Sequence, residues 1–149
     1  MKPTHFTKPS SIVTYGLRAL VDLALHERTG PVTVRMIARR QEIPVRSLEQ
    51  VLNRLKRGGV VQAERGPRGG YRLSKAPSQI PVSRIFQSLT QRQKGNGKGF
   101  AAADPAASVW RQMEKAVATT LEATTLETLV TQAREQTPHP ITHRFTFHI

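Results

Sequence analysis

The chain has 149 residues, enough for a single domain, and its 23 Lys and Arg against 10 Asp and Glu give a net charge of +13 with histidine neutral. A chain this basic usually meets an anionic partner, of which nucleic acid is the first candidate and a membrane surface the second. It has no cysteine, which excludes disulfides, thiol catalysis and metal sites held by thiolates. No apolar run approaches the length of about 18 residues needed to span a membrane, and no apolar segment follows the basic N-terminus, so we expect a cytoplasmic protein without membrane contact.

The basic excess lies in the first half of the chain. Residues 1–75 hold 15 Lys and Arg against five Asp and Glu, a balance of +10, whereas residues 76–149 hold eight against five, a balance of +3. A solvated surface is the ordinary explanation, because most Lys and Arg are exposed in any protein. The asymmetry favours instead a polyanion-binding module followed by a more neutral extension.

Residues 1–10 carry two prolines and no periodicity, which indicates a flexible arm. Apolar residues then recur at spacings of three and four over residues 11–28, which predicts a helix with one solvent face. Arg18 and Asp22 are four residues apart on that solvent face, where we expect them to form an exposed ion pair. The same face carries Thr14 and His26.

Two shorter helices are predicted next, and the turn between them at residues 42–44 gives the outline of a helix-turn-helix. The first covers residues 34–41 and has Thr33 as its N-cap. The second starts near Pro44, since proline is tolerated in a first turn, and ends at the pair Gly58-Gly59. The inner faces carry Val34, Ile37 and Ala38 on the first helix and Val45, Leu48, Val51, Leu52 and Leu55 on the second. The outer faces carry Arg35, Arg39 and Arg40 on the first and Arg46, Ser47, Gln50, Asn53, Arg54 and Arg57 on the second.

A β-hairpin is predicted from two short strands at residues 60–65 and 71–73, joined by the glycine-rich turn at residues 66–70. Arg65 precedes that turn and Arg68 lies at its tip. The order helix, helix-turn-helix, basic hairpin is typical of a winged helix-turn-helix, so residues 11–90 are expected to form a DNA-binding domain.

The C-terminal part is predicted as helices over residues 82–90, 107–123 and 126–136, with a polar, glycine-rich loop at residues 91–106 and a poorly ordered tail at residues 137–149. The long middle helix carries more apolar surface than so little remaining chain can cover. We therefore expect it to pair with the same helix of a second copy. The residues predicted for this dimer contact are Trp110, Met113, Val117 and Leu121.

The second helix of the motif can enter the major groove, where residues near its N-terminus reach base edges. There Arg46 can bond to guanine through two hydrogen bonds and Gln50 to adenine. Arg54 and Arg57 lie further along and are better placed for phosphates, and the arginines of the hairpin can reach phosphates or a narrow minor groove. The predicted DNA-binding residues are Arg35, Arg46, Ser47, Gln50, Arg54, Arg57, Arg65, Arg68 and Tyr71.

The sequence resembles the Rrf2 family of bacterial transcriptional regulators over about residues 11–130. The likeness is carried by the hairpin at residues 65–73, the helical segments at residues 48–55 and 15–25, the pair Trp110-Arg111, and residues 125–129. The resemblance implies a winged helix with a long dimerisation helix, acting as a homodimer on near-palindromic double-stranded DNA. One departure is Pro44, where the family often has a capping Ser or Thr.

A second departure concerns the cofactor. Many members of the family sense iron, nitric oxide or redox state through an iron–sulfur cluster, held by three cysteines in the loop that precedes the Trp-Arg helix. The corresponding loop at residues 91–106 has none, so we expect no cofactor in this chain. Either the protein belongs to a cluster-free branch that senses a small molecule or a protein, or alanines have replaced cysteines, as five alanines at residues 101–107 suggest.

These observations predict a mainly α fold with a small β-hairpin wing, and a sequence-specific DNA-binding transcriptional regulator that represses as a homodimer. The alternative is a basic module that binds RNA. An enzyme is not expected, because no acid–base or nucleophile–base pair is apparent. A metal site is not expected either, because the histidines grouped toward the C-terminus lie in the proline-containing tail.

Overall fold

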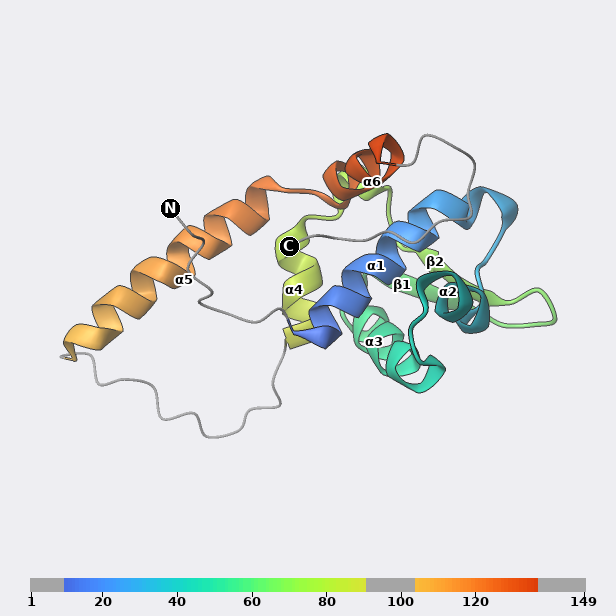
Figure 1. Ribbon diagram of the computed structural model, residues 1–149, viewed down its shortest axis with the longest axis horizontal. Coiled ribbons are helices and arrows are strands. Elements are labelled where there is room, and N and C mark those ends of the chain that lie inside the picture. Colours follow the sequence, from blue (N-terminus) through green and yellow to red (C-terminus); the bar gives the residue numbers. More distant parts are fainter. Residues whose placement is uncertain (1–9, 91–103, 137–149) are drawn as a thin grey trace.

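The structure, a computed structural model, describes residues 10–90 and 104–136 (Figure 1). Over these ranges the chain forms six α-helices and one two-stranded antiparallel sheet, which confirms the predicted mainly α fold with a β-hairpin wing. The glycine-rich segment 91–103, the tail and all but the last residue of the N-terminal arm lie outside the described residues. The elements are α1 (Ser11–His26), η1 (Glu27–Thr29), α2 (Val34–Gln41), α3 (Val45–Arg57), β1 (Val61–Glu64), β2 (Gly70–Leu73), η2 (Pro77–Gln79), α4 (Val82–Thr90), α5 (Pro105–Ala123) and α6 (Leu126–Glu135).

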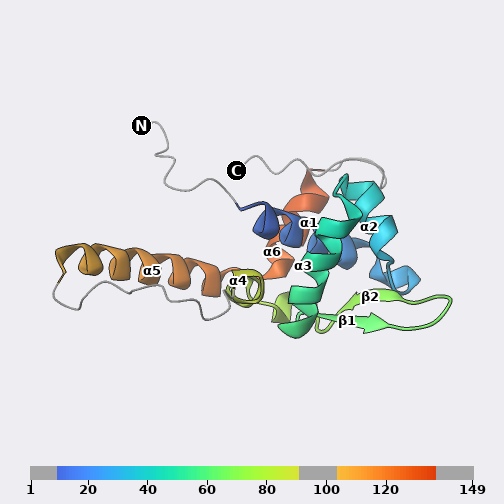
Figure 2. The same ribbon diagram turned by 90° about the horizontal axis from the view of Figure 1, so that it is seen from below.

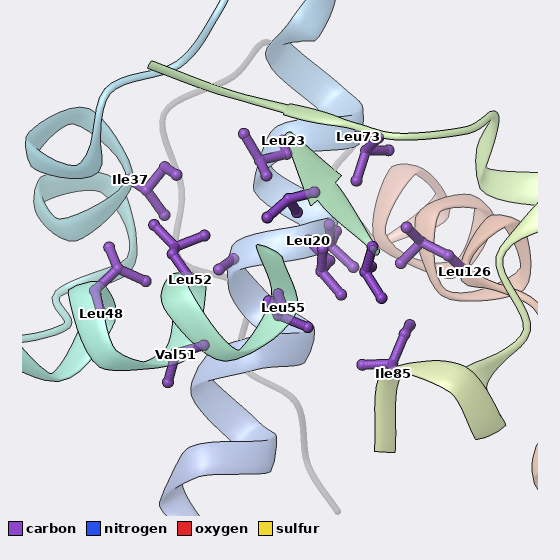
Figure 3. Close-up of a cluster of buried hydrophobic side chains, with 14 of the residues drawn as sticks. Leu20, Leu23, Ile37, Leu48, Val51, Leu52, Leu55, Leu73, Ile85 and Leu126 are labelled. Carbon is purple, nitrogen blue, oxygen red and sulfur yellow. The ribbon is translucent and has the colours of Figure 1, made fainter. Parts of the chain in front are cut away.

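Helix α1 is the central helix of the fold. It packs against α2, α3, α4, α6 and strand β2, and its five successive residues 19–23 are all buried. Leu20 and Leu23 point into the same apolar cluster as Leu52 of α3 and Leu126 of α6 (Figure 3). A helix enclosed on several sides has no solvent face at its middle. The predicted exposed position of Asp22 is therefore wrong, because this side chain is completely buried.

The helix-turn-helix follows the predicted boundaries closely. The Thr33 hydroxyl accepts a hydrogen bond from the Met36 N–H at 3.2 Å and so caps α2, as expected. The turn to α3 is made possible by Glu42, whose backbone is left-handed with φ 52°. Helix α3 begins at Val45 without any side-chain cap. The prediction that Val45 belongs to the inner face is wrong, since this first-turn residue is 42% exposed, while the other four inner residues of α3 are buried.

The β-hairpin is tied to the helical part by a third extended segment. Strands β1 and β2 pair from Val61↔Leu73 to Glu64↔Gly70. The N–H and C=O groups of Val32 exchange hydrogen bonds with those of Tyr71, at 3.0 and 2.8 Å. Because Val32 immediately precedes the N-cap of α2, these bonds fix the wing beside the start of the helix-turn-helix.

Helix α5 projects away from the rest of the described chain, on the side opposite the wing (Figures 1 and 2). It is capped by the Asp104 carboxylate, which accepts a hydrogen bond from the Ala106 N–H at 2.8 Å. The chain then returns to the body, where the Leu126 N–H donates to the Ile80 carbonyl at 2.8 Å and α6 packs on α1. None of the helices in the described ranges is long and apolar enough to cross a membrane.

Candidate nucleic-acid interface

The N-terminal half of α3 presents polar side chains that the protein leaves uncommitted. Arg46 and Gln50 are exposed and Ser47 is half-buried. Within the described part of the chain, no side-chain hydrogen bond or ion pair holds Arg46 or Gln50. Both side chains can therefore adapt to a ligand without first breaking an internal contact.

The C-terminal half of α3 is fixed to α4 by two arginines, one on each helix, and each donates a hydrogen bond to the other helix. Arg54 of α3 is half-buried and donates from Nη1 to the Leu89 carbonyl, in the last turn of α4, at 2.7 Å. Arg84 of α4 donates from Nε to the Gly58 carbonyl, at the end of α3, at 3.1 Å. Each guanidinium thus satisfies a carbonyl at the C-terminal end of the other helix, where a positive charge is favourable.

The close contact between these helices depends on Gly58. A Cβ atom at this position would lie 1.9 Å from the Ser88 hydroxyl oxygen of α4, so a larger residue would force the helices apart. The C-terminal end of α3 is therefore held closely against α4. Arg57, one residue before Gly58, is exposed to solvent.

The tip of the wing is also open to solvent. Arg65 and Arg68 are exposed, and Gly66 between them has φ 114°, a backbone conformation that L residues rarely adopt. In the two strands, which form the base of the wing, Arg72 of β2 is paired with Glu64 of β1 through an Nε to Oε1 contact of 2.6 Å. The wing therefore divides into a base held by internal contacts and a tip with two exposed arginines.

The remaining two predicted DNA-binding residues have different surroundings. Arg35 is exposed on the first turn of α2. Tyr71 is half-buried and packs against the hydrophobic core, and its backbone bonds to Val32 as described above. Core packing is a sufficient structural reason for a tyrosine at position 71. Its contact with DNA therefore stays a prediction.

The elements that carry these residues adjoin one another. Helix α2 packs on α3, and α3 packs on β1, so the helix-turn-helix and the base of the wing form one continuous unit (Figure 2). Residues 34–73 hold ten Lys and Arg against three Asp and Glu, a balance of +7. More than half of the net charge of +13 is thus concentrated on this unit, which suits it to a polyanion.

Sequence reasoning missed one cluster of polar residues, which lies between α1 and α2. Asp22 pairs with Arg40, whose Nη2 lies 2.6 Å from Oδ2, and not with Arg18 as expected. The prediction that Arg40 points outward is therefore also wrong, and Arg18 bonds to Gln41 of α2 instead. A signal was present in the sequence, because Asp22 is the only polar residue in the run Ala19–Leu25.

Comparison with known proteins agrees with this architecture. The profile of the Rrf2 family, described as an iron-dependent transcriptional regulator, matches residues 10–132. The HTH-type transcriptional regulator slr0846 of Synechocystis sp. is 41% identical over 125 residues, covering 80% of this chain and 85% of that protein. The HTH-type transcriptional regulator IscR of Photorhabdus laumondii is 34% identical over 122 residues, covering 78% of this chain and 74% of that protein.

Two solved structures have the same fold. IscR of T. potens superposes with a TM-score of 0.74 at 32% identity, covering 91% of this chain and 94% of that one. CymR, described as the global cysteine regulator of B. subtilis, superposes with a TM-score of 0.71 at 30% identity, covering 85% of this chain and 98% of that one. These proteins are regulators of transcription and not enzymes.

The residues of this chain do not fit a thiolate-held iron–sulfur cluster. Such clusters are bound by cysteine thiolates, of which at most half are replaced by histidine in the Rieske type, and the full sequence contains no cysteine. Within the described ranges, no three His, Asp or Glu side chains are grouped so that they could hold a metal ion. The segment 91–103, which makes up most of the predicted loop at residues 91–106, lies outside those ranges.

Proposed function

The chain belongs to the Rrf2 family of transcriptional regulators, and from this premise we propose that it is a repressor that binds a near-palindromic DNA operator as a homodimer. The observation that carries the proposal is the contrast along α3, whose C-terminal half is fixed to α4 while Arg46 and Gln50 remain exposed and uncommitted. Occupying an operator blocks the same DNA to other proteins, which makes repression the simplest outcome.

In the proposed complex the N-terminal half of α3 lies in the major groove. Arg46 donates two hydrogen bonds to a guanine, Gln50 bonds to an adenine, and Ser47 bonds to a neighbouring base. Residues further from the base edges neutralise phosphates and supply affinity without sequence preference. These are Arg35, Arg54 and Arg57 on the helices and Arg65, Arg68 and Tyr71 on the wing.

The dimer contact is proposed to lie on α5. This helix has 19 residues, and Ala107 is the only one of them that is buried. Val109, Trp110, Met113 and Val117 are all at least 38% exposed, which is unusual for large apolar side chains grouped on one helix. The same helix of a second copy would cover this surface about a two-fold axis, and Leu121 extends the contact toward α6.

The signal that controls the proposed repressor is a small molecule or a partner protein and not an iron–sulfur cluster. Without thiolates, the purified protein is expected to be colourless, and its DNA affinity should not change with oxygen, nitric oxide or iron chelators. Absorbance near 400 nm that bleaches on oxidation would contradict this expectation, and is readily measured on freshly purified protein.

The proposal is tested by selecting bound duplexes from a random pool and measuring affinity for the enriched sequence. We expect two half-sites related by two-fold symmetry, separated by about 10–10.5 base pairs or a multiple of that spacing. The enriched duplex should also lower transcription from an overlapping promoter when the protein is added. Failure to enrich any sequence would contradict the proposal, and equal competition by structured RNA of the same length would favour the RNA-binding alternative.

A further inference from the structure

The polar cluster between α1 and α2 is centred on the buried Asp22 carboxylate. Arg40 donates to it from Nη2 at 2.6 Å and from Nε at 2.9 Å, so that both carboxylate oxygens are engaged. Gln41 donates from Nε2 to Oδ1 at 3.1 Å. The His26 ring lies 3.7 Å away on the same helix. Asp22 therefore holds two consecutive residues at the C-terminal end of α2.

A second arginine, Arg18 of α1, donates hydrogen bonds to the same end of α2. Arg18 donates from Nε to the Gln41 side-chain oxygen at 3.3 Å and from Nη2 to the Gln41 backbone carbonyl. Gln41 is the last residue of α2, and only the turn at residues 42–44 separates it from α3. The whole cluster thus lies at the point where the chain passes from α2 into the turn before α3.

A buried ion pair is a poor device for stability alone. Removing the Asp22 carboxylate completely from water, and most of the Arg40 side chain with it, is costly, and replacing such a pair by apolar residues of similar size is often neutral or stabilising. The pair of Asp22 and Arg40 instead restricts the orientation of α2 on α1. Hydrogen bonds from one guanidinium to both carboxylate oxygens require one specific arrangement of the two helices. Apolar packing alone would tolerate small shifts of α2 on α1.

We propose that Asp22 is a positioning residue for DNA recognition, which fixes α2 and hence the reading end of α3 through Arg40 and Gln41. The inference rests on the proposed function, since it assumes that α3 reads an operator. It assigns to Arg40 an internal role, in contrast to its exposed neighbour Arg39 on the same helix. Specificity for one DNA sequence would then depend on residues that never touch DNA.

The test uses the double variant Asp22→Leu/Arg40→Met, which removes one charge of each sign and leaves the net charge unchanged. We expect its melting temperature to fall only slightly, because apolar packing replaces the ion pair while the buried Gln41 amide loses its Asp22 acceptor. Affinity for the duplex selected by the wild type should fall about 3- to 30-fold. Affinity for a random duplex, and its dependence on salt, should not change.

Two further variants keep the test decisive if the double variant fails to fold. Arg40→Lys retains the charge but loses the paired hydrogen bonds, and should lower affinity for the selected duplex while leaving the random duplex unaffected. Arg39→Met is the matched control, and should lower affinity for the two duplexes by the same factor if it changes either. A purely structural role for the cluster would move the melting temperature and leave the ratio of the two affinities constant.

Three outcomes would overturn the inference. The first is that the double variant and Arg40→Lys both keep the wild-type ratio between the affinities for the selected and the random duplex. The second is a double variant whose salt dependence on random duplex falls by about one counterion, since Arg40 would then be a phosphate contact. The third is a wild type that does not discriminate at all, in which case the proposed function fails together with the inference.

Discussion

The winged-helix region and α5 treat their apolar side chains in opposite ways. From Ser11 to Thr90 every α-helix buries apolar residues in one cluster around α1, and α6 returns to complete it. Helix α5 leaves the body and exposes Val109, Trp110, Met113 and Val117. The winged-helix region is therefore complete within one chain, whereas α5 leaves a row of apolar side chains exposed, the surface on which the proposed dimer depends.

The largest effect is expected in the complete region. Leu52 of α3 is fully buried, so Leu52→Ala should lower the free energy of unfolding by about 2–5 kcal/mol, because it leaves a cavity in the core. Val117→Ala on α5 should cost less than about 0.5 kcal/mol at protein concentrations where the chain is monomeric. Urea denaturation measures both. Equal losses at low concentration would mean that α5 is packed within its own chain.

Charge placed on α5 should separate the two copies while leaving each chain folded. Met113→Glu puts a carboxylate on the exposed apolar side, and should lower affinity for a duplex with two half-sites by about 100-fold or more, to the affinity for one half-site. Gln112→Glu adds the same charge at an exposed position about 100° around α5 from Met113, outside the apolar row, and is the matched control. Sedimentation equilibrium should show the 16.6 kDa monomer for Met113→Glu and the dimer for Gln112→Glu. A monomeric wild type would refute the proposed dimer.

Substitutions of Arg54 and Arg57, near the end of α3, should affect different properties of the protein, namely its stability and its DNA binding. Arg54→Ala removes the hydrogen bond to the Leu89 carbonyl, and should lower the free energy of unfolding by about 1.5–3 kcal/mol, the range for bonds made by charged groups. Arg57→Ala should leave stability unchanged and lower the salt dependence of DNA binding by about one counterion per subunit. If Arg54→Ala loses stability but keeps the wild-type salt dependence, Arg54 belongs to the scaffold and not to the phosphate contacts.

The sequence predicted best what short segments determine. The bounds of α2 and α4 were predicted to the residue, because Thr33 and the spacing of apolar residues are local signals. The hairpin followed equally from its glycines and flanking strands. Each of these features depends on residues within a few positions of one another, which the sequence alone displays.

The contacts that the sequence does not predict join side chains to partners distant in the chain. Arg40 meets Asp22 from 18 positions away and Arg54 meets Leu89 from 35, so neither contact is visible in helical spacing. Asp22 was misplaced because the one-stripe pattern assumes a solvent face, which the middle of α1 lacks. Val45 was misplaced because the first turn of α3 extends beyond the core.

The affinity of Arg46→Ala for the selected and the random duplex tests the central claim most directly, because that claim places the N-terminal end of α3 against base edges. We expect a loss of about 1–3 kcal/mol on the selected duplex and almost none on the random one, since a paired contact to guanine discriminates by that amount. Arg57→Ala, measured in parallel, should weaken both duplexes alike. If Arg46→Ala also weakens both duplexes by the same factor, Arg46 is a phosphate contact and α3 does not read the operator as described.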